Sequence, residues 1–235
     1  MNNMMKTYFV SVSLTLCALC SLAQEIVFQN QRFEINAVKA EVVQLNGEQV
    51  LKVERDLKAL SFDVKNLAAT VDEPTYVKLK NVNLENGIIE VKMLSRVQDP
   101  SPFEAAQGFI GLAFRINERD SAFESIYLRP KVARSENQLG RNHVVQYYSY
   151  PDYKFDRLRK ESPGLYETYA DVGLDEWITF RVELDGGKAR LFINNQKNPS
   201  FIVEKMKGFT TNGSVALWVD IGTVGYFKDL KITKR

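Results

Sequence analysis

Cysteine is almost absent from this sequence, and histidine occurs once. The two cysteines, Cys17 and Cys20, both lie in the first 23 residues. If that segment is removed, the remaining chain has no thiol for a disulfide or a cysteine metal site. A single histidine, His143, also excludes a zinc site built from several imidazoles. A packed hydrophobic core must therefore supply the stability of the fold.

Neither sign of charge is in clear excess. The chain has 31 lysine and arginine residues against 29 aspartate and glutamate residues, which gives a net charge of +2 at pH 7. This balance does not indicate a protein that binds nucleic acid or an anionic membrane. After the first 23 residues no apolar run approaches the ~18 residues of a membrane-spanning helix, so we expect no membrane span.

The one long apolar run is at the N-terminus. Lys6 and Thr7 precede an apolar stretch over 8–19, and Ser21-Leu22-Ala23 follows as a small-x-small cleavage pattern. These features predict a secretory signal peptide over 1–23, cleaved near Ala23, and a secreted or periplasmic protein. A lipoprotein anchor is the alternative, but leucine precedes both cysteines where a small residue would be needed. One domain over 24–235 remains.

From residue 24 onward the apolar residues alternate with a period near two, and turn residues interrupt them every ~8–12 positions. The pattern predicts an all-β fold, a two-sheet antiparallel jelly-roll sandwich. Asn46-Gly47 is the strongest hairpin signal. A helical turn is expected at 155–159, within a charged loop, and a strand at 165–172. The predicted core layer comprises Ile89, Val91, Met93, Ile110, Leu112, Phe114, Ile178, Phe180, Val182, Leu191, Val215 and Leu217.

Two groups of segments resemble known families. EWITFRVELDGGKARLFINN (176–195) and GSVALWVDIGTVGYFKDLKI (213–232) resemble the C-terminal half of the concanavalin A-like lectin/glucanase superfamily. The middle segments YLRPKVAR, RNHVVQYYSYPDY and LRKESPGLYETY resemble secreted bacterial proteins grouped with family 16 glycoside hydrolases and 3-keto-disaccharide hydrolases. The resemblance implies a carbohydrate partner and a hydrolase or lyase of modified, 3-keto type glycosides, with its groove on the concave sheet.

The catalytic motif of family 16 is missing. Those enzymes use an E-x-D-x-(x)-E strand that places two carboxylates across the glycosidic bond. Glu183-Leu184-Asp185 is the nearest string, but Gly186 and Gly187 follow it and predict a hairpin turn instead. Whether the protein is an enzyme therefore stays open. A non-catalytic carbohydrate-binding module and a structural or partner-binding envelope protein are the alternatives.

The stretch over 121–172 departs from its flanks, because it contains seven of the ten tyrosines and the only histidine. Aromatic faces beside guanidinium groups suit a hydroxyl-rich or anionic ligand. The alternative is an aromatic surface insertion braced by ion pairs. Nearby, Gly111 and Ala113 on one face of their strand leave room for a ligand against the sheet, or else mark a crowded crossing of strands.

His143 and Glu124 are the candidate proton carriers. His143 titrates near neutrality, and the resemblance implies that such a histidine abstracts the proton beside a keto group. The alternative is a histidine hydrogen-bonded at the start of a strand. The candidate ligand-binding residues are Tyr127, Arg129, Arg141, Asn142, Gln146, Tyr147, Arg157, Arg159, Tyr166 and Trp218.

Two further questions stay open at this point. Trp218 is either a stacking platform for a sugar or, as is commoner in sandwiches, partly buried core. Loop carboxylates leave room for a structural or catalytic calcium ion, although no Asp-x-Asp ladder marks such a site. No other cofactor is expected.

Overall fold

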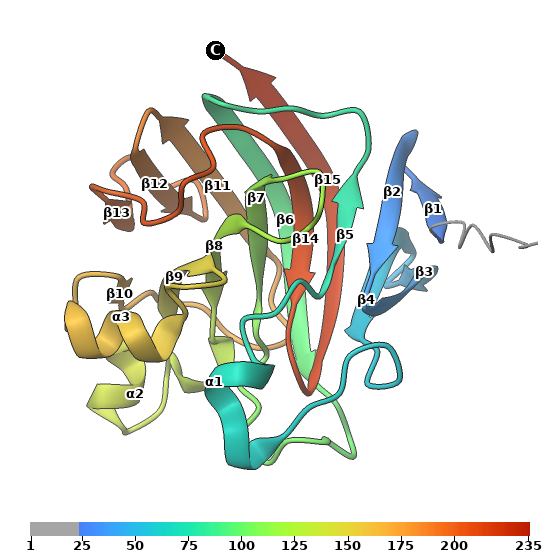
Figure 1. The fold of residues 1–235 in the computed structure, drawn as a ribbon. Helices are drawn as coiled ribbons and strands as arrows, with labels where there is room; N and C mark the ends of the chain where they lie inside the picture. Colours follow the sequence, from blue (N-terminus) through green and yellow to red (C-terminus); the bar gives the residue numbers. More distant parts are fainter. Residues whose placement is uncertain (1–23) are drawn as a thin grey trace, which may run out of the picture.

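The computed structural model describes residues 24–235, so the predicted signal peptide lies outside the described part of the chain. Two antiparallel sheets pack face to face (Figure 1). The first sheet has the order β1-β2-β5-β14-β7-β8-β9-β10, and the second has the order β13-β12-β11-β6-β15-β4-β3. The predicted all-β, two-sheet architecture is confirmed. Its organisation as one domain over 24–235 stays a prediction.

The elements have the following bounds. The strands are β1 Glu25–Phe28, β2 Gln31–Asn36, β3 Val38–Leu45, β4 Glu48–Arg55, β5 Tyr76–Leu79, β6 Gly87–Val97, β7 Ile110–Ile116, β8 Phe123–Leu128, β9 Val145–Tyr150, β10 Glu167–Thr168, β11 Ile178–Asp185, β12 Lys188–Ile193, β13 Phe201–Val203, β14 Ser214–Val219 and β15 Thr223–Lys234. The helices are α1 Leu67–Thr70, α2 Gln138–Asn142 and α3 Phe155–Glu161, with 3-10 turns at Val64–Asn66 and Pro130–Val132.

Local sequence chemistry explains several of these boundaries. Asn46 and Gly47 both adopt positive φ angles, 52° and 84°, and Leu45 pairs with Glu48 across the turn, as the hairpin signal predicts. The helical turn expected at 155–159 is α3. The strand expected over 165–172 is wrong beyond β10, because most of that segment is irregular backbone.

The hydrophobic core lies between the two sheets and contains all twelve residues of the predicted layer. Phe180 on β11, for example, has no exposed area and sits among strands of the second sheet. Burial of these side chains is the main contribution to stability in a chain whose described residues contain no cysteine.

An aromatic layer covers the outer face of the first sheet. Trp218 lies with its ring centroid 4.9 Å from that of Tyr127 and 5.7 Å from that of Tyr148. The segment between β4 and β5, which includes α1, lies in front of the first sheet in Figure 1. The indole of Trp218 donates to the carbonyl of Glu73 in this segment at 2.8 Å. The middle of this face is therefore covered, and the pockets lie toward the ends of the strands.

Gly111 is required by this packing. A Cβ added there would lie 2.3 Å from the carbonyl oxygen of Ile126 and 2.5 Å from the Cα of Tyr127. Ala113, two residues on, is fully buried. The expectation that these small residues form a shallow ligand floor is wrong, because the neighbouring strand and its tyrosine occupy that space. The alternative, a crowded crossing of strands, is what the structure contains.

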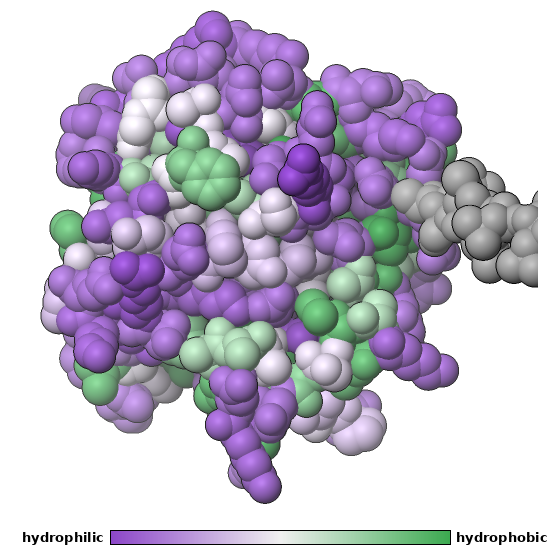
Figure 2. All heavy atoms as spheres, in the orientation of Figure 1, coloured by the Kyte–Doolittle hydropathy of each residue, from purple (hydrophilic) through white to green (hydrophobic). Residues whose placement is uncertain are grey.

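Over residues 24–235, none of the helices combines the length and the apolar composition needed to cross a membrane. In the orientation of Figure 1, the space-filling view shows a mainly hydrophilic surface with apolar side chains gathered near α1 (Figure 2).

Candidate functional site

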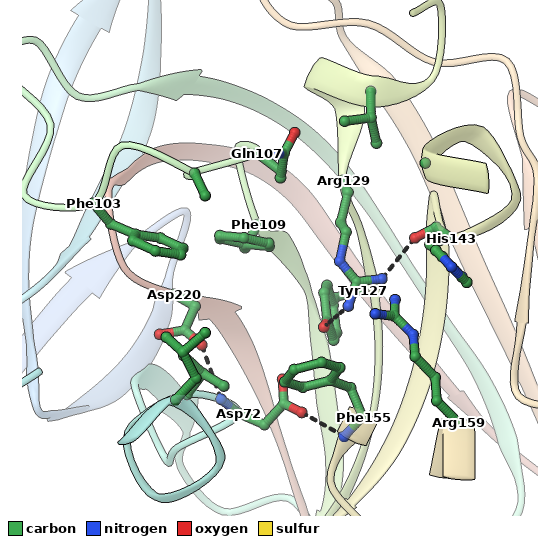
Figure 3. A pocket seen from close by; sticks show the side chains of 15 residues that line it. Asp72, Phe103, Gln107, Phe109, Tyr127, Arg129, His143, Phe155, Arg159 and Asp220 are labelled. Atoms are coloured by element: carbon green, nitrogen blue, oxygen red, sulfur yellow. Dashed lines mark hydrogen bonds between the residues drawn. The ribbon is translucent and has the colours of Figure 1, made fainter. Parts of the chain in front are cut away.

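A pocket of about 270 Å³ lies at one end of the first sheet, where α1, the loop before β7, the end of β8 and the start of α3 meet. Its walls combine apolar, aromatic and charged side chains (Figure 3). The lining residues are Leu67, Val71, Asp72, Phe103, Ala105, Gln107, Phe109, Tyr127, Arg129, Val132, Gly140, His143, Phe155, Arg159 and Asp220.

Four aromatic residues line the pocket beside its aliphatic side chains: Phe103, Phe109, Tyr127 and Phe155. Phe109 and Tyr127 meet edge to face, with centroids 6.3 Å apart and an interplanar angle of 73°. Tyr127 is almost fully buried, whereas Phe103 and Phe109 keep part of their surface exposed. Partly exposed rings around a small cavity can stack on the apolar face of a flat ligand.

Two aspartates occupy one side of the pocket. The backbone N–H of Asp72 donates to Oδ2 of Asp220 at 2.9 Å, and Arg55 donates to Oδ1 of Asp220 at 2.7 Å. Oδ2 of Asp72 accepts the backbone N–H of Phe155 at 2.9 Å, which ties the loop before β5 to the start of α3. Asp72 also has a φ of 56°, an unusual backbone conformation for a residue other than glycine.

Asp72 differs from Asp220 in lacking a cation bonded to its carboxylate. Burial raises the pKa of Asp72 to about 7, and the nearby charge of Asp220 acts in the same direction. A carboxyl group with this pKa exchanges a proton near neutrality. Asp72 is therefore able to act as a general acid or base toward a ligand in the pocket.

Two arginines occupy the opposite side (Figure 3). Arg129 donates to the backbone carbonyl of His143 at 2.6 Å and to the hydroxyl of Tyr127. Arg159 donates through Nε to Oε2 of Glu167 at 2.8 Å. The guanidinium carbons of Arg129 and Arg159 lie 5.9 Å and 5.1 Å from the ring centroid of Phe155, so both cations approach the same ring.

His143 contributes to the pocket mainly through its backbone. Its carbonyl points at Arg129 in Figure 3, while its ring lies on the far side from the cavity. Nδ1 is 2.7 Å from Oε2 of Glu167, the same oxygen that Arg159 contacts. Burial lowers the pKa of His143, and the charge of Arg159 lowers it further, while the neighbouring carboxylate of Glu167 acts in the opposite direction.

Glu124 and Tyr147 are not in the pocket, although both were candidates. Residues alternate between the faces of a strand, so Glu124 and Tyr127 point to opposite sides of β8. Oε2 of Glu124 accepts the hydroxyl of Tyr147 at 2.6 Å, and Oε1 accepts the backbone N–H of Gly208 at 2.9 Å. Burial raises the pKa of Glu124 to about 6. This pair faces the space between the sheets and holds the connection between β13 and β14.

Three other candidates are buried in structural roles. Gln146 lies beneath Arg129, with its Oε1 3.4 Å from two guanidinium nitrogens, and donates to the carbonyl of Tyr166 at 3.1 Å. The hydroxyl of Tyr166 donates to the carbonyl of Lys205 at 3.0 Å. Trp218 has no exposed area, so its ring is not available as a stacking platform.

The remaining candidates lie on the surface of the helical segments. Arg141 is stacked over Tyr169 at 4.9 Å, and Asn142 accepts a hydrogen bond from Gln138 at 2.8 Å. Arg157 forms an ion pair with Glu161 one helical turn away, at 2.7 Å. Of the twelve candidates, the structure brings Tyr127, Arg129, His143 and Arg159 to the wall of the pocket.

The sequence patterns missed both pocket aspartates. Asp220 directly follows β14 and continues the face of Trp218. An acidic residue at the end of an apolar strand is the sequence signal that could have identified it, and in the structure it is buried. Asp72 lies in an irregular segment between α1 and β5, where periodicity gives no information. Within residues 24–235, no three histidine, cysteine, aspartate or glutamate side chains come together in a way that could hold a metal ion.

No protein-family model matches the sequence, and no curated protein matches it significantly. Solved structures do match the fold. A carbohydrate binding module, CBM66 from Bacillus subtilis, is 8% identical with a TM-score of 0.51, over 84% of this chain and 96% of that one. The chain has a concanavalin A-like fold.

Two looser matches are a putative glycosyl hydrolase from Parabacteroides distasonis and the Ca2+/Man3GlcNAc-bound form of the VIP36 exoplasmic/lumenal domain. The first is 14% identical with a TM-score of 0.47, over 86% of this chain and 85% of that one. The second is 9% identical with a TM-score of 0.43, over 91% of this chain and 84% of that one.

Proposed function

We propose that this protein is an exported carbohydrate-binding protein that holds one sugar unit in the pocket between α1 and α3. The observation that carries the proposal is the combination of partly exposed aromatic rings with two acids and two guanidinium groups around one small cavity. At about 270 Å³ the pocket is slightly smaller than the ~300–1,000 Å³ typical of small-molecule sites. It therefore suits a single ring, free or at the end of a glycan, better than a stretch of polymer.

Each part of the wall has a role in this proposal. The rings of Phe103 and Phe109 stack on the apolar face of the sugar. The carboxylate of Asp72 accepts hydrogen bonds from hydroxyl groups, and Arg129 and Arg159 donate to ring and hydroxyl oxygens. The CBM66 structure, which shares the fold, is itself named a carbohydrate binding module, and this agrees with the proposal.

A second candidate function is hydrolysis or elimination at a modified, 3-keto type glycoside. Asp72 favours it, because an acid with a pKa of about 7 facing the cavity is suited to taking a proton from the carbon beside a ketone. Arg129 or Arg159 would then stabilise the enolate oxygen, and collapse of the enolate would break the glycosidic C–O bond at the next carbon. The departing oxygen would take a proton from Asp72 or water and leave as an alcohol, and addition of water to the resulting enone would complete hydrolysis. Asp72 replaces His143 as the favoured base in this version, since the ring of His143 lies on the far side from the cavity.

A glycan array run beside a release assay on 3-keto-glycosides tests both candidates. Binding without release supports the module, and release that Asp72→Asn abolishes supports the enzyme. The absence of both binding and release contradicts both candidates and favours an envelope role.

Ala105→Trp places a large side chain at an exposed position on the rim of the pocket and should block binding. Ala59→Trp, also exposed but away from the pocket, is the matched control. N-terminal sequencing of exported protein tests cleavage near Ala23.

A further inference from the structure

The charges around the pocket are not balanced on the side of the two arginines. Arg129 is only 7% exposed, yet no ion pair within residues 24–235 includes it. Its hydrogen-bond partners, the carbonyl of His143, the hydroxyl of Tyr127 and the amide of Gln146, are all neutral. Asp72, on the other side of the pocket, is near enough to act on Arg129 electrostatically, but no carboxylate touches the guanidinium group. A largely buried cation without a carboxylate in contact is costly, so Arg129 attracts an anion that can reach it.

Arg159 adds a second positive charge to the same side. Its Nε contacts Glu167, and the same carboxylate lies against His143. Within residues 24–235 no other acid forms an ion pair with Arg129, His143 or Arg159. The side chain of Arg159 keeps 31% of its area exposed and lines the pocket. In Figure 3 its terminal nitrogens face Arg129. Two guanidinium groups therefore face one cavity with one carboxylate behind them.

We propose that the sugar held in this pocket is acidic, with a carboxylate on its ring that bridges Arg129 and Arg159. This inference rests on the proposed function and names its ligand class. A planar carboxylate matches the fork of a guanidinium group, and the hydroxyl groups on the opposite edge of the ring face Asp72 and Asp220. The two aspartates disfavour a ligand with several negative charges, such as a nucleotide, because it would place charge against them as well.

Isothermal titration calorimetry with three related ligands tests the assignment. D-Galacturonic acid carries the carboxylate, its methyl ester keeps the shape without the charge, and D-galactose lacks the group. D-Glucuronic acid, its methyl ester and D-glucose form a second set. In whichever of the two sets, galactose or glucose, binds to the protein, we expect the acid to bind at least about tenfold more tightly than its methyl ester. The reason is that charge-assisted hydrogen bonds are about twice as strong as neutral ones. The preference should shrink as salt is raised.

Arg159→Gln should remove the preference for the acid over the ester while leaving the weaker binding of the ester in place. Arg157→Gln is the matched control, because Arg157 lies on the same helix but pairs with Glu161 and does not line the pocket. Thermal melting of both variants checks folding. The comparison of acid with ester on the unmodified protein does not depend on any variant.

The outcomes separate the two proposals. The acidic sugar is supported if the parent binds the acid about tenfold more tightly than the ester, and if Arg159→Gln loses this preference while Arg157→Gln keeps it. Equal binding of acid, ester and neutral sugar overturns the acidic sugar and leaves carbohydrate binding standing. No binding of any sugar here or on the array overturns both.

Discussion

Replacing Asp72 by asparagine should stabilise the protein at high pH and leave its stability unchanged at low pH. The carboxyl group has a pKa of about 7 in the fold against an ordinary value of 3.8. The folded state therefore keeps this proton more tightly than the unfolded chain does. As pH rises from about 4 to 7 the unfolded chain releases the proton first, so folding stability falls through this window.

The size of the effect follows from the same difference. One pKa unit corresponds to about 1.4 kcal/mol, so the buried charge of Asp72 costs at most about 4 kcal/mol above pH 7. Asparagine keeps an oxygen that can accept the backbone N–H of Phe155 but carries no charge. The free energy of unfolding of Asp72→Asn should exceed that of the parent by up to this amount at pH 8 and match it near pH 4.

Urea unfolding at pH 4, 6 and 8 measures this difference. Asp152→Asn, at an exposed position, controls for the general loss of one carboxylate. If the difference in the free energy of unfolding between Asp72→Asn and the parent is the same at all three pH values, the reasoning is refuted. It is also refuted if the parent becomes more stable relative to the variant as pH rises. Either result would mean that the carboxyl group of Asp72 is not destabilised by burial. The enzymatic candidate would then lose its support.

Three further predictions concern the fold and the limits of the pocket. Phe180→Ala should lower the free energy of unfolding by roughly 3–5 kcal/mol, measured in urea, because it removes a fully buried ring. Gly111→Ala should cost roughly 1–3 kcal/mol, because its methyl group would meet Ile126 and Tyr127, and a stability equal to the parent would contradict that packing. Glu124→Gln should leave sugar binding unchanged by calorimetry, because Glu124 faces between the sheets; loss of binding without loss of folding would reverse this placement.

The fold was predictable because alternation along strands is a local signal. Ile110, Leu112 and Phe114 alternate with smaller residues, and burial of the first set follows directly from the period of two. The pattern could not say that the opposite face is buried as well. The segment that covers Trp218 comes from between β4 and β5, far away in the sequence and without periodicity.

The candidate site was predictable only in part, for the same reason. Tyr127, Arg129 and Arg159 lie in the stretch 121–172, whose richness in tyrosine and arginine predicts a binding role. Asp72 meets Phe155 across 83 positions of sequence, and no local pattern carries that information. Glu124 was chosen as a candidate proton carrier for its chemistry, but the alternation along β8 places it on the face opposite to Tyr127.

Chemical-shift mapping tests the central claim most directly. The sugar that binds best is titrated into isotope-labelled protein, and the perturbed backbone amides are located. A sugar held between α1 and α3 predicts that the changes cluster at 71–73, 103–109, 127–129 and 155–159. Changes centred instead on the groove at the other end of the sheet, around Asn81, Asn117 and Phe209, would contradict the assignment of the site.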